Sequence, residues 1–86
     1  MRRAARIDGN QGEIVAALRQ IGCSVYYIKE PVDLLVGYRG RTVVLEVKNG
    51  PDWRLKPSQA KFFGGEFRGE AYIVQSVDEA LKAVVR

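Results

Sequence analysis

The chain has 86 residues, a net charge of +4, one cysteine and no histidine. These values allow one small domain and exclude an internal disulfide, a Cys/His zinc cluster and nucleophilic triads that use histidine. Its apolar runs are too short to span a membrane and no signal-peptide segment is recognisable, so we expect a soluble, cytoplasmic protein. The positive charge favours a polyanionic partner, although a merely basic surface explains it equally well.

The first predicted element is a helix over residues 10 to 21. The apolar residues that recur there at helical spacing are Ile14, Ala17, Leu18 and Ile21. Asn10 stands three residues before Glu13 in the arrangement of a capping box, and Gly22 is placed to end the helix. Residues 1 to 7 form a basic arm ahead of this helix, and we expect the arm to be flexible.

Three β-prone segments follow the helix. The first is VYYIKE, at residues 25 to 30. Two further runs, 33 to 38 and 41 to 48, flank the pair Arg39-Gly40, which is typical of a tight turn. Residues 33 to 48 are therefore predicted to form a β-hairpin.

The second half of the chain predicts a loop, a bent helix, a strand and a last helix. Residues 49 to 51, Asn-Gly-Pro, break the hairpin strand and open an exposed loop. A helix begins near Pro57 and is shortened or bent by the glycines at 64 and 65. Residues 71 to 75 predict a strand, and Ser76 opens the last helix as a capping residue.

The predicted fold class is α/β, with the order α-β-β-β-α-β-α and a mixed β-sheet flanked by helices. The hairpin supplies antiparallel pairing. The β-α-β unit that runs from the second hairpin strand to residues 71 to 75 predicts a parallel pair with a right-handed crossover.

Residues 43 to 48, VVLEVK, place an acid and a base on one face of a hydrophobic strand. Glu46 and Lys48 share that face because side chains alternate along an extended chain. If the hairpin closes at residues 39 and 40, Asp33 lies across from this pair. The two carboxylates, with the backbone carbonyl of Val47, would form an oxygen-lined pocket of the kind that Mg²⁺ prefers.

A divalent ion in such a pocket would serve phosphodiester hydrolysis. It would bind a phosphate oxygen, activate a bound water and screen the developing negative charge. Lys48 would orient or help to deprotonate the attacking water, or stabilise the pentacovalent phosphate. Glu13 lies at the edge of the apolar face of the first helix and would reach the same site through a water or a second ion.

The arrangement resembles the PD-(D/E)xK nuclease superfamily and, within it, the virus-type replication-repair nuclease (VRR-NUC) family. The matching residues are Glu13, Asp33 in EPVDLLVGYRG, Glu46 and Lys48 in LEVKNG, and Gln59 in KPSQAKF. The resemblance covers nearly the whole chain. One departure is that the family usually has proline directly before the metal-binding aspartate, whereas Val32 stands there and Pro31 precedes it. Asp52, after Pro51, follows the strand rather than preceding it, so we reject it as the motif aspartate.

The resemblance implies a restriction-endonuclease-like core and a Mg²⁺- or Mn²⁺-dependent DNA endonuclease. For a stand-alone minimal member it implies a homodimer that cuts branched DNA such as four-way (Holliday) junctions. The implied metal ligands are Asp33, Glu46 and the Val47 carbonyl, with assistance from Glu13. Gln59 would steady Lys48 or the scissile phosphate. Aromatic residues that would supply a dimer interface are Trp53, Phe62, Phe63 and Phe67.

Simpler explanations compete with these assignments. Glu46 and Lys48 could form an exposed ion pair worth about 0–1 kcal/mol, and Asp33 could be a turn residue. Basic residues that we expect around the pocket, each by default an ordinary solvated charge, are Arg39, Arg41, Arg54, Lys56 and Lys61. The alternative function is a non-catalytic nucleic-acid-binding module with a nuclease-like fold, and RNA is an alternative substrate.

Overall fold

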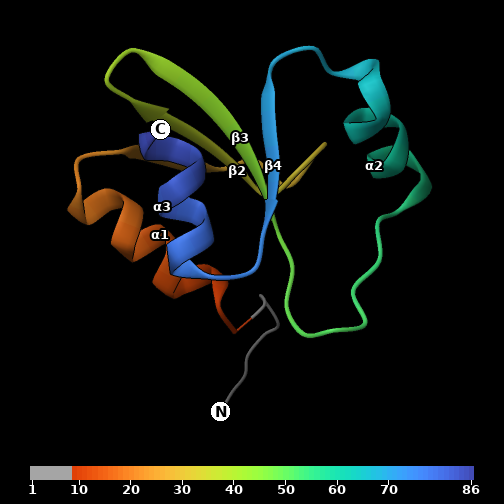
Figure 1. Ribbon diagram of the computed structural model, residues 1–86, viewed down its shortest axis with the longest axis horizontal. Helices are drawn as coiled ribbons and strands as arrows, with labels where there is room; N and C mark the ends of the chain where they lie inside the picture. Colours follow the sequence, from red (N-terminus) through yellow and green to blue (C-terminus); the bar gives the residue numbers. More distant parts are fainter. Residues whose placement is uncertain (1–8) are drawn as a thin grey trace.

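The computed structural model describes residues 9–86, so the basic arm expected at residues 1 to 7 lies outside the described residues. The elements in chain order are α1 (Gln11–Gln20), β1 (Ser24–Tyr27), β2 (Leu34–Tyr38), β3 (Arg41–Val47), α2 (Pro57–Lys61), the π-helical turn η1 (Phe62–Glu66), β4 (Glu70–Val74) and α3 (Val77–Val85). The four strands form one sheet, with α1 and α3 on one side and α2 on the other (Figure 1). The mixed α/β class and the flanking helices are thus confirmed. Within residues 9–86, no helix combines the length and the apolar character that a bilayer span requires.

The sheet has the order β1-β2-β3-β4 and is antiparallel except for its last pair. The predicted hairpin is present: Tyr38 pairs with Arg41, and Arg39 and Gly40 take the positive φ angles, 50° and 82°, that a tight two-residue hairpin turn needs. Strands β3 and β4 run parallel, as the β-α-β pattern predicted. β3 is therefore a central strand, and β4 forms one edge of the sheet.

The larger hydrophobic core lies between the sheet and the pair α1 and α3. Alternate residues of β2, β3 and β4 enter it, and Ile14 and Leu18 of α1 are completely buried there. Val84 of α3 closes it from the other helix. Each such buried aliphatic side chain stabilises the fold by about 1.5–3 kcal/mol. The free Cys23 is buried in the same core, as expected for a small apolar residue.

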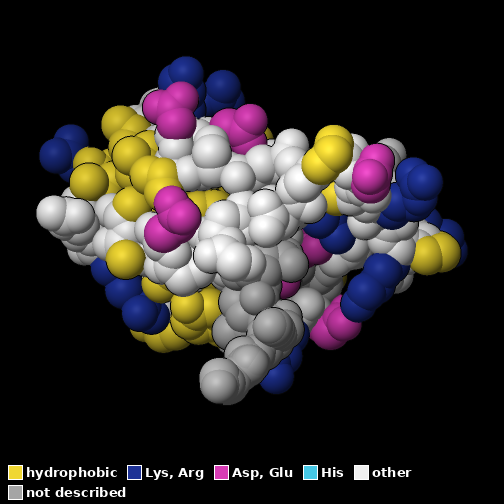
Figure 2. All heavy atoms as spheres, turned by 90° about the horizontal axis from the view of Figure 1, so that it is seen from below, with side chains coloured by type: hydrophobic (Ala, Val, Ile, Leu, Met, Phe, Trp, Pro, Cys, Tyr) yellow, Lys and Arg dark blue, Asp and Glu magenta, His cyan; other side chains and the backbone are white. Residues whose placement is uncertain are grey.

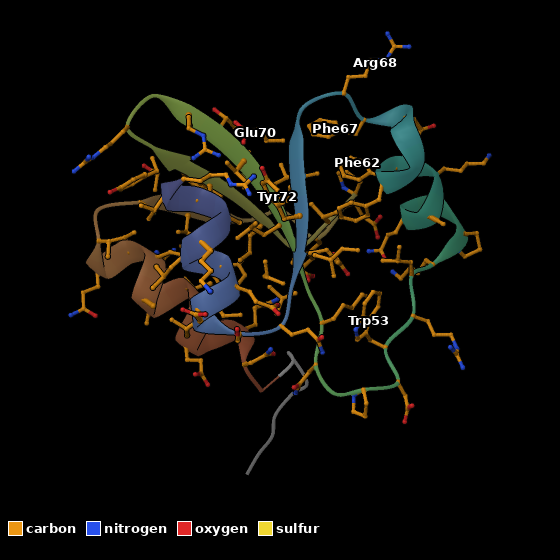
Figure 3. All side chains as sticks on the ribbon, viewed as in Figure 1. Trp53, Phe62, Phe67, Arg68, Glu70 and Tyr72 are labelled. Atoms are coloured by element: carbon orange, nitrogen blue, oxygen red, sulfur yellow. The ribbon has the colours of Figure 1, made fainter. Side chains whose placement is uncertain are left out.

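A smaller core lies on the opposite face of the sheet, under α2 and η1. Its buried members are Val32, Val44 and Phe62. The ring of Phe67 stacks on that of Phe62, with centroids 4.6 Å apart, and both lie between β4 and the α2 segment (Figure 3). Phe62 is thus a core residue rather than an exposed interface residue, which corrects that part of the prediction. Val32, the residue directly before Asp33, is also fully buried.

The start of α1 differs from the prediction. Asn10 occupies the N-cap position but its side chain caps no N–H group of the helix, so the predicted capping box with Glu13 is absent. Its Nδ2 instead donates to the carbonyls of Lys48, at 3.0 Å, and Gln75, at 2.8 Å. These carbonyls follow the last residues of β3 and β4, and they offer Asn10 two partners that local sequence does not reveal. The consequence is that α1 is tied to the end of the sheet.

The other predicted helix boundaries are confirmed. Gly22, with φ of 100°, ends α1: its N–H bonds to the carbonyl of Arg19, and that of Cys23 to Leu18, as in a Schellman motif. The hydroxyl of Ser76 caps α3 by accepting from the N–H of Glu79 at 3.1 Å. The glycines after α2 bend the chain as predicted, with φ of 125° at residue 65.

Candidate functional site

Glu46 is buried and Lys48 is partly buried, and the two side chains form an ion pair at the end of β3. Lys48 Nζ lies 3.0 Å from Glu46 Oε2, and the two side chains are only 15% and 6% exposed. Both project from the same sheet face as Val44, toward the side that carries α2. Removing two charges from water costs several kcal/mol per ion, and their attraction does no more than offset that cost. The explanation as an exposed surface pair is therefore excluded.

Asp33 meets Glu46 through reciprocal hydrogen bonds between β2 and β3. The backbone N–H of Asp33 donates to Glu46 Oε1 at 3.2 Å. In return, the backbone N–H of Val47 donates to Asp33 Oδ2 at 2.8 Å. This contact follows from the hairpin register. Leu34 pairs with Leu45, so the next residues outward, Asp33 and Glu46, lie opposite each other. The structure thus brings the two predicted carboxylates to adjacent strand ends.

The Val47 carbonyl is oriented toward the same side. In a strand, the N–H and C=O of one residue project to the same edge, and the Val47 N–H points to Asp33. The donor set is therefore two carboxylates and one carbonyl, which are hard oxygen ligands. Mg²⁺ is commonly bound by one or two carboxylates and completes its octahedron with waters and substrate phosphate oxygens, so these residues fit such an ion. Residues 9–86 contain no cluster of three or more Asp, Glu, His or Cys side chains around a common point.

Gln59 is buried, with 5% exposure, and links α2 to the segment before β2. Its Oε1 accepts from the N–H of Lys56 at 3.2 Å, and its Nε2 donates to the carbonyl of Pro31 at 3.4 Å. In the described part of the chain, no hydrogen bond joins Gln59 to Lys48. The side chain therefore holds the backbone two residues before Asp33, which is a more indirect position than the predicted one beside the lysine.

Glu13 is separated from the other candidates. It is exposed on α1, the helix that covers the opposite face of the sheet from α2. Among residues 9–86, no hydrogen bond or ion pair connects Glu13 with Asp33, Glu46 or Lys48. The α1 residue that touches the site strand is instead Asn10, whose Nδ2 bonds to the carbonyl of Lys48.

Asn10 is a site neighbour that sequence reasoning missed. Its Oδ1 is buried and has no hydrogen-bond partner in the described structure, while Nδ2 has two. The only signal in the sequence was a polar residue directly before a helix, and this signal is equally typical of an ordinary N-cap.

The basic residues that we expected around the pocket fall into two groups. Arg41 lies at the start of β3, the opposite end from Glu46, and donates to Glu70 and to carbonyls at the end of α3. The hydrogen bond from Arg41 lowers the pKa of Glu70 below its ordinary value and raises the pKa of Arg41. Arg39 sits on the adjacent hairpin turn. Neither residue borders the carboxylates.

The other three basic residues lie on the side that carries α2. Arg54 and Lys56 belong to the loop before α2, and Lys61 is its last residue. Lys56 Nζ approaches Glu30 to 3.8 Å, with both side chains well exposed. A view from below shows acidic and basic side chains side by side in a recess on this side of the molecule (Figure 2). These three cations therefore belong to the same side of the sheet as Glu46 and Lys48.

The site thus brings together two carboxylates and one lysine. Burial raises the pKa of the Cys23 thiol, which disfavours the reactive thiolate. No protein-family model, no curated protein and no solved structure matches the chain. The assignment of function therefore depends on the geometry of the site.

Proposed function

We propose that this protein is a metal-dependent DNA endonuclease with a restriction-endonuclease-like core of the VRR-NUC type. It would hydrolyse phosphodiester bonds in branched DNA such as four-way junctions. The observation that carries the proposal is the meeting of Asp33, Glu46 and Lys48 at the ends of β2 and β3, with the ion pair mostly buried. A buried ion pair adds little to the stability of a fold, because apolar residues of similar size in its place often give equal or higher stability. Use in chemistry is the better explanation for it.

In this proposal Asp33, Glu46 and the Val47 carbonyl hold Mg²⁺ or Mn²⁺. The bound ion supplies Lewis acidity and a water of lowered pKa. Lys48, beside Glu46, places a positive charge where the attacking water and the phosphate oxygens meet. Gln59 positions the segment that carries Asp33, since its amide holds the Pro31 carbonyl. Glu13 contributes to the metal or water only through an intervening water or second ion.

The experiment is a cleavage assay on a labelled four-way junction, with and without Mn²⁺, for the wild type and Lys48→Ala. We expect metal-dependent nicks from the wild type and a loss on the order of 10²–10³-fold in the variant, the typical effect of removing one group that stabilises developing charge. Arg68→Ala, which removes an exposed cation from the connection between η1 and β4, is the matched control. Circular dichroism confirms that the variants are folded. A wild type that binds the junction and never cuts it would contradict the proposal.

A second candidate function is a nucleic-acid-binding module without catalysis. The observation that favours it is that Glu46 is satisfied internally: one oxygen accepts from Asp33 and the other pairs with Lys48. In that case these residues brace the ends of two strands. The same assay separates the two functions, and a parallel reaction with an RNA junction tests the alternative substrate.

Dimerisation belongs to the same proposal. A four-way junction requires two matched incisions, and one copy of this small chain provides one site. With Phe62 in the core, Trp53 and Phe67 are predicted interface residues that remain exposed, at 36% and 38%. A solution mass equal to that of two chains supports the homodimer, and a monomer mass at assay concentration excludes it.

A further inference from the structure

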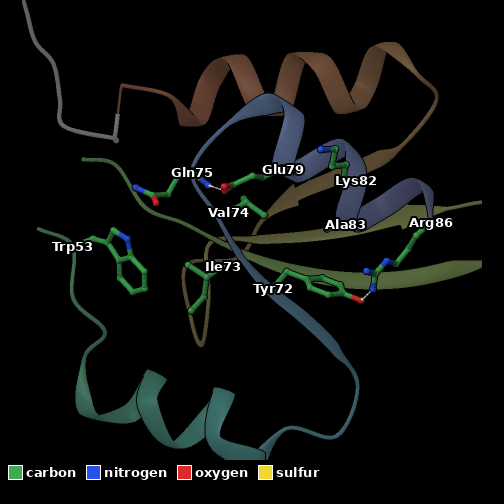
Figure 4. A pocket seen from close by; sticks show the side chains of 9 residues that line it. All are labelled: Trp53, Tyr72, Ile73, Val74, Gln75, Glu79, Lys82, Ala83 and Arg86. Carbon is green, nitrogen blue, oxygen red and sulfur yellow. Dashed lines mark hydrogen bonds between the residues drawn. The ribbon is translucent and has the colours of Figure 1, made fainter. Parts of the chain in front are cut away.

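A pocket of about 460 Å³ lies along β4, the open edge of the sheet. Its walls come from three separate segments: the loop before α2, strand β4 and helix α3 (Figure 4). Trp53 stands at one side of β4, and Lys82 and Arg86 stand at the other. The volume falls in the range of pockets that bind small organic groups, about 300–1,000 Å³.

The pocket adjoins the carboxylate site through the β3–β4 ladder. Ile73, which lines the pocket, is the register partner of Glu46. Paired residues on neighbouring strands project to the same face of a sheet, about 4.7–4.9 Å apart. The N–H of Lys48 also donates to the carbonyl of Val74 at 3.0 Å. A group bound against Ile73 would therefore lie next to any phosphate held at Glu46.

The open edge gives this pocket unpaired backbone groups. The Val74 carbonyl accepts from Lys48 and so points toward β3. Because the backbone groups of successive residues in a strand point to opposite edges, the N–H and C=O of Ile73 point away from β3, to the open edge of the sheet. Among residues 9–86, no strand pairs with this edge of β4. One N–H donor and one C=O acceptor thus face the pocket, which is the pattern that the edge of a nucleobase can meet.

Aromatic and cationic side chains flank these backbone groups. The Trp53 indole is 36% exposed and offers a flat surface. Arg86 donates to the hydroxyl of Tyr72 at 3.2 Å, and its guanidinium lies over that ring. Lys82 is paired only with Asp78, in an exposed contact that exchanges easily with another anion. The Glu79 carboxylate is occupied as an acceptor from the N–H of Gln75 at 2.7 Å.

We infer that this pocket binds one unpaired nucleotide of the nucleic-acid substrate, with the base against Trp53 and the phosphate near Lys82 and Arg86. The inference depends on the proposed nuclease function and deepens it, because it names the substrate class: nucleic acid in which a nucleotide leaves the stack beside the cut. Branch points, flaps and single-stranded ends have such nucleotides, and a blunt continuous duplex does not. Stacking on an aromatic side chain accepts any base, so the pocket selects structure rather than sequence.

Trp53 is the only tryptophan of the chain and reports directly on the pocket. The test titrates the full chain, without divalent metal so that nothing is cut, and follows tryptophan fluorescence. The probes are a short oligothymidylate, a flapped duplex, a blunt duplex of equal length and an acidic peptide of equal charge. We expect the first two to quench the fluorescence and the blunt duplex to leave it unchanged. Equal quenching by the blunt duplex, or quenching by the peptide alone, overturns the inference.

Two charge-matched variants test the phosphate contact. Lys82→Ala should weaken oligothymidylate binding on the order of tenfold, whereas Arg68→Ala, which removes one charge from the connection between η1 and β4, should change it little (Figure 3). Trp53→Ala, measured by anisotropy of a labelled oligothymidylate, should weaken binding to a similar extent. Equal effects of the Lys82 and Arg68 variants would show a diffuse electrostatic attraction and overturn the specific pocket.

The pocket and the nuclease function fail in distinguishable ways. If unpaired nucleotides quench the fluorescence but no substrate is cleaved in the presence of metal, the nucleotide pocket is supported and the nuclease function is contradicted. The opposite result is cleavage that Lys48→Ala abolishes and Trp53→Ala leaves unchanged, with no quenching by unpaired nucleotides. It supports the nuclease function and contradicts the nucleotide pocket.

Discussion

The two ends of β3 each carry an ion pair, and the pairs differ in what surrounds them. At the start of the strand, Arg41 binds Glu70 at the surface and also donates to carbonyls at the end of α3. At its end, the partly buried Lys48 pairs with the buried Glu46, and Asp33 adds a second carboxylate. The first pair joins β3, β4 and α3. The second pair lies at the end of β3, and the hydrogen bond from Asp33 links it to the neighbouring chain segment.

This difference indicates what each pair does. The arginine satisfies several acceptors at once, and the carbonyls at a helix end attract a cation, so the first pair has a complete structural explanation. The second pair is more deeply buried and so carries a larger cost of desolvation, and Glu46 offsets part of it by pairing with Lys48 and accepting from the N–H of Asp33. In the proposed function, these charges bind ligands that bring their own opposite charges, a metal ion and a phosphate.

The largest expected effect follows from breaking the buried pair. Glu46→Ala leaves the Lys48 ammonium without its partner, and an uncompensated buried charge costs about 3–5 kcal/mol. Urea unfolding followed by circular dichroism measures the loss. Glu66→Ala, at an exposed position of η1, is the control and should change stability little. A Glu46 variant as stable as this control would mean that the pair is solvated in solution.

Replacing both members of the pair should be far less damaging. The double variant Glu46→Leu with Lys48→Met removes the desolvation cost, which is a gain of about 1–4 kcal/mol, but leaves the Asp33 N–H without its acceptor, a loss of about 1–3 kcal/mol, so stability should stay close to that of the wild type. Thermal unfolding tests this directly. A double variant that is less stable than either single variant would contradict the distinction between the two ends of β3.

A smaller effect is expected at Asn10. Asn10→Ala removes two hydrogen bonds to the carbonyls of Lys48 and Gln75, and leaving such acceptors unpaired costs about 1–3 kcal/mol. Gln20→Ala, an exposed change in the same helix, is the matched control. The two variants are compared by urea unfolding. Equal midpoints would show that the tie between α1 and the sheet end contributes nothing.

The smallest effect concerns the surface pair and its dependence on pH. The pKa of Glu70 is lowered, first by the hydrogen bond from Arg41, so the ionised carboxylate stabilises the fold at pH values above its ordinary pKa, about 4.3. That contribution is lost as the pH falls through this value toward the lowered pKa in the fold. The stability difference between wild type and Glu70→Gln should therefore be present at neutral pH and shrink in acid. A difference that grows in acid would contradict the assignment.

Local signals explain why much of the fold was predictable. The turn at Arg39-Gly40 and the alternation along β3 fix the hairpin register, and this register alone brings Asp33 to Glu46. Gly22 ends α1 by a rule that requires only the helix itself. These features depend on residues that are near one another in the sequence, so composition and spacing are sufficient to find them.

Features that depend on tertiary packing were not predictable in the same way. The side chain of Asn10 donates to carbonyls 38 and 65 residues away and does not cap its own helix. Arg41 meets Glu70 only because β3 and β4 pair in parallel. Phe62 is buried because the segment after α2 folds back over Val44, which no periodicity in the sequence indicates. The positions of Glu13 and Gln59 relative to the site likewise depend on how their helices pack.

The most direct test of the site compares the wild type with the Glu46→Leu, Lys48→Met double variant on one labelled junction in the presence of Mn²⁺. Circular dichroism checks that the double variant is folded, so that lost cleavage reports on chemistry rather than on unfolding. We predict that both proteins bind the junction and that only the wild type nicks it. Cleavage by the double variant at the wild-type rate would show that the cluster at the end of β3 does not carry the reaction.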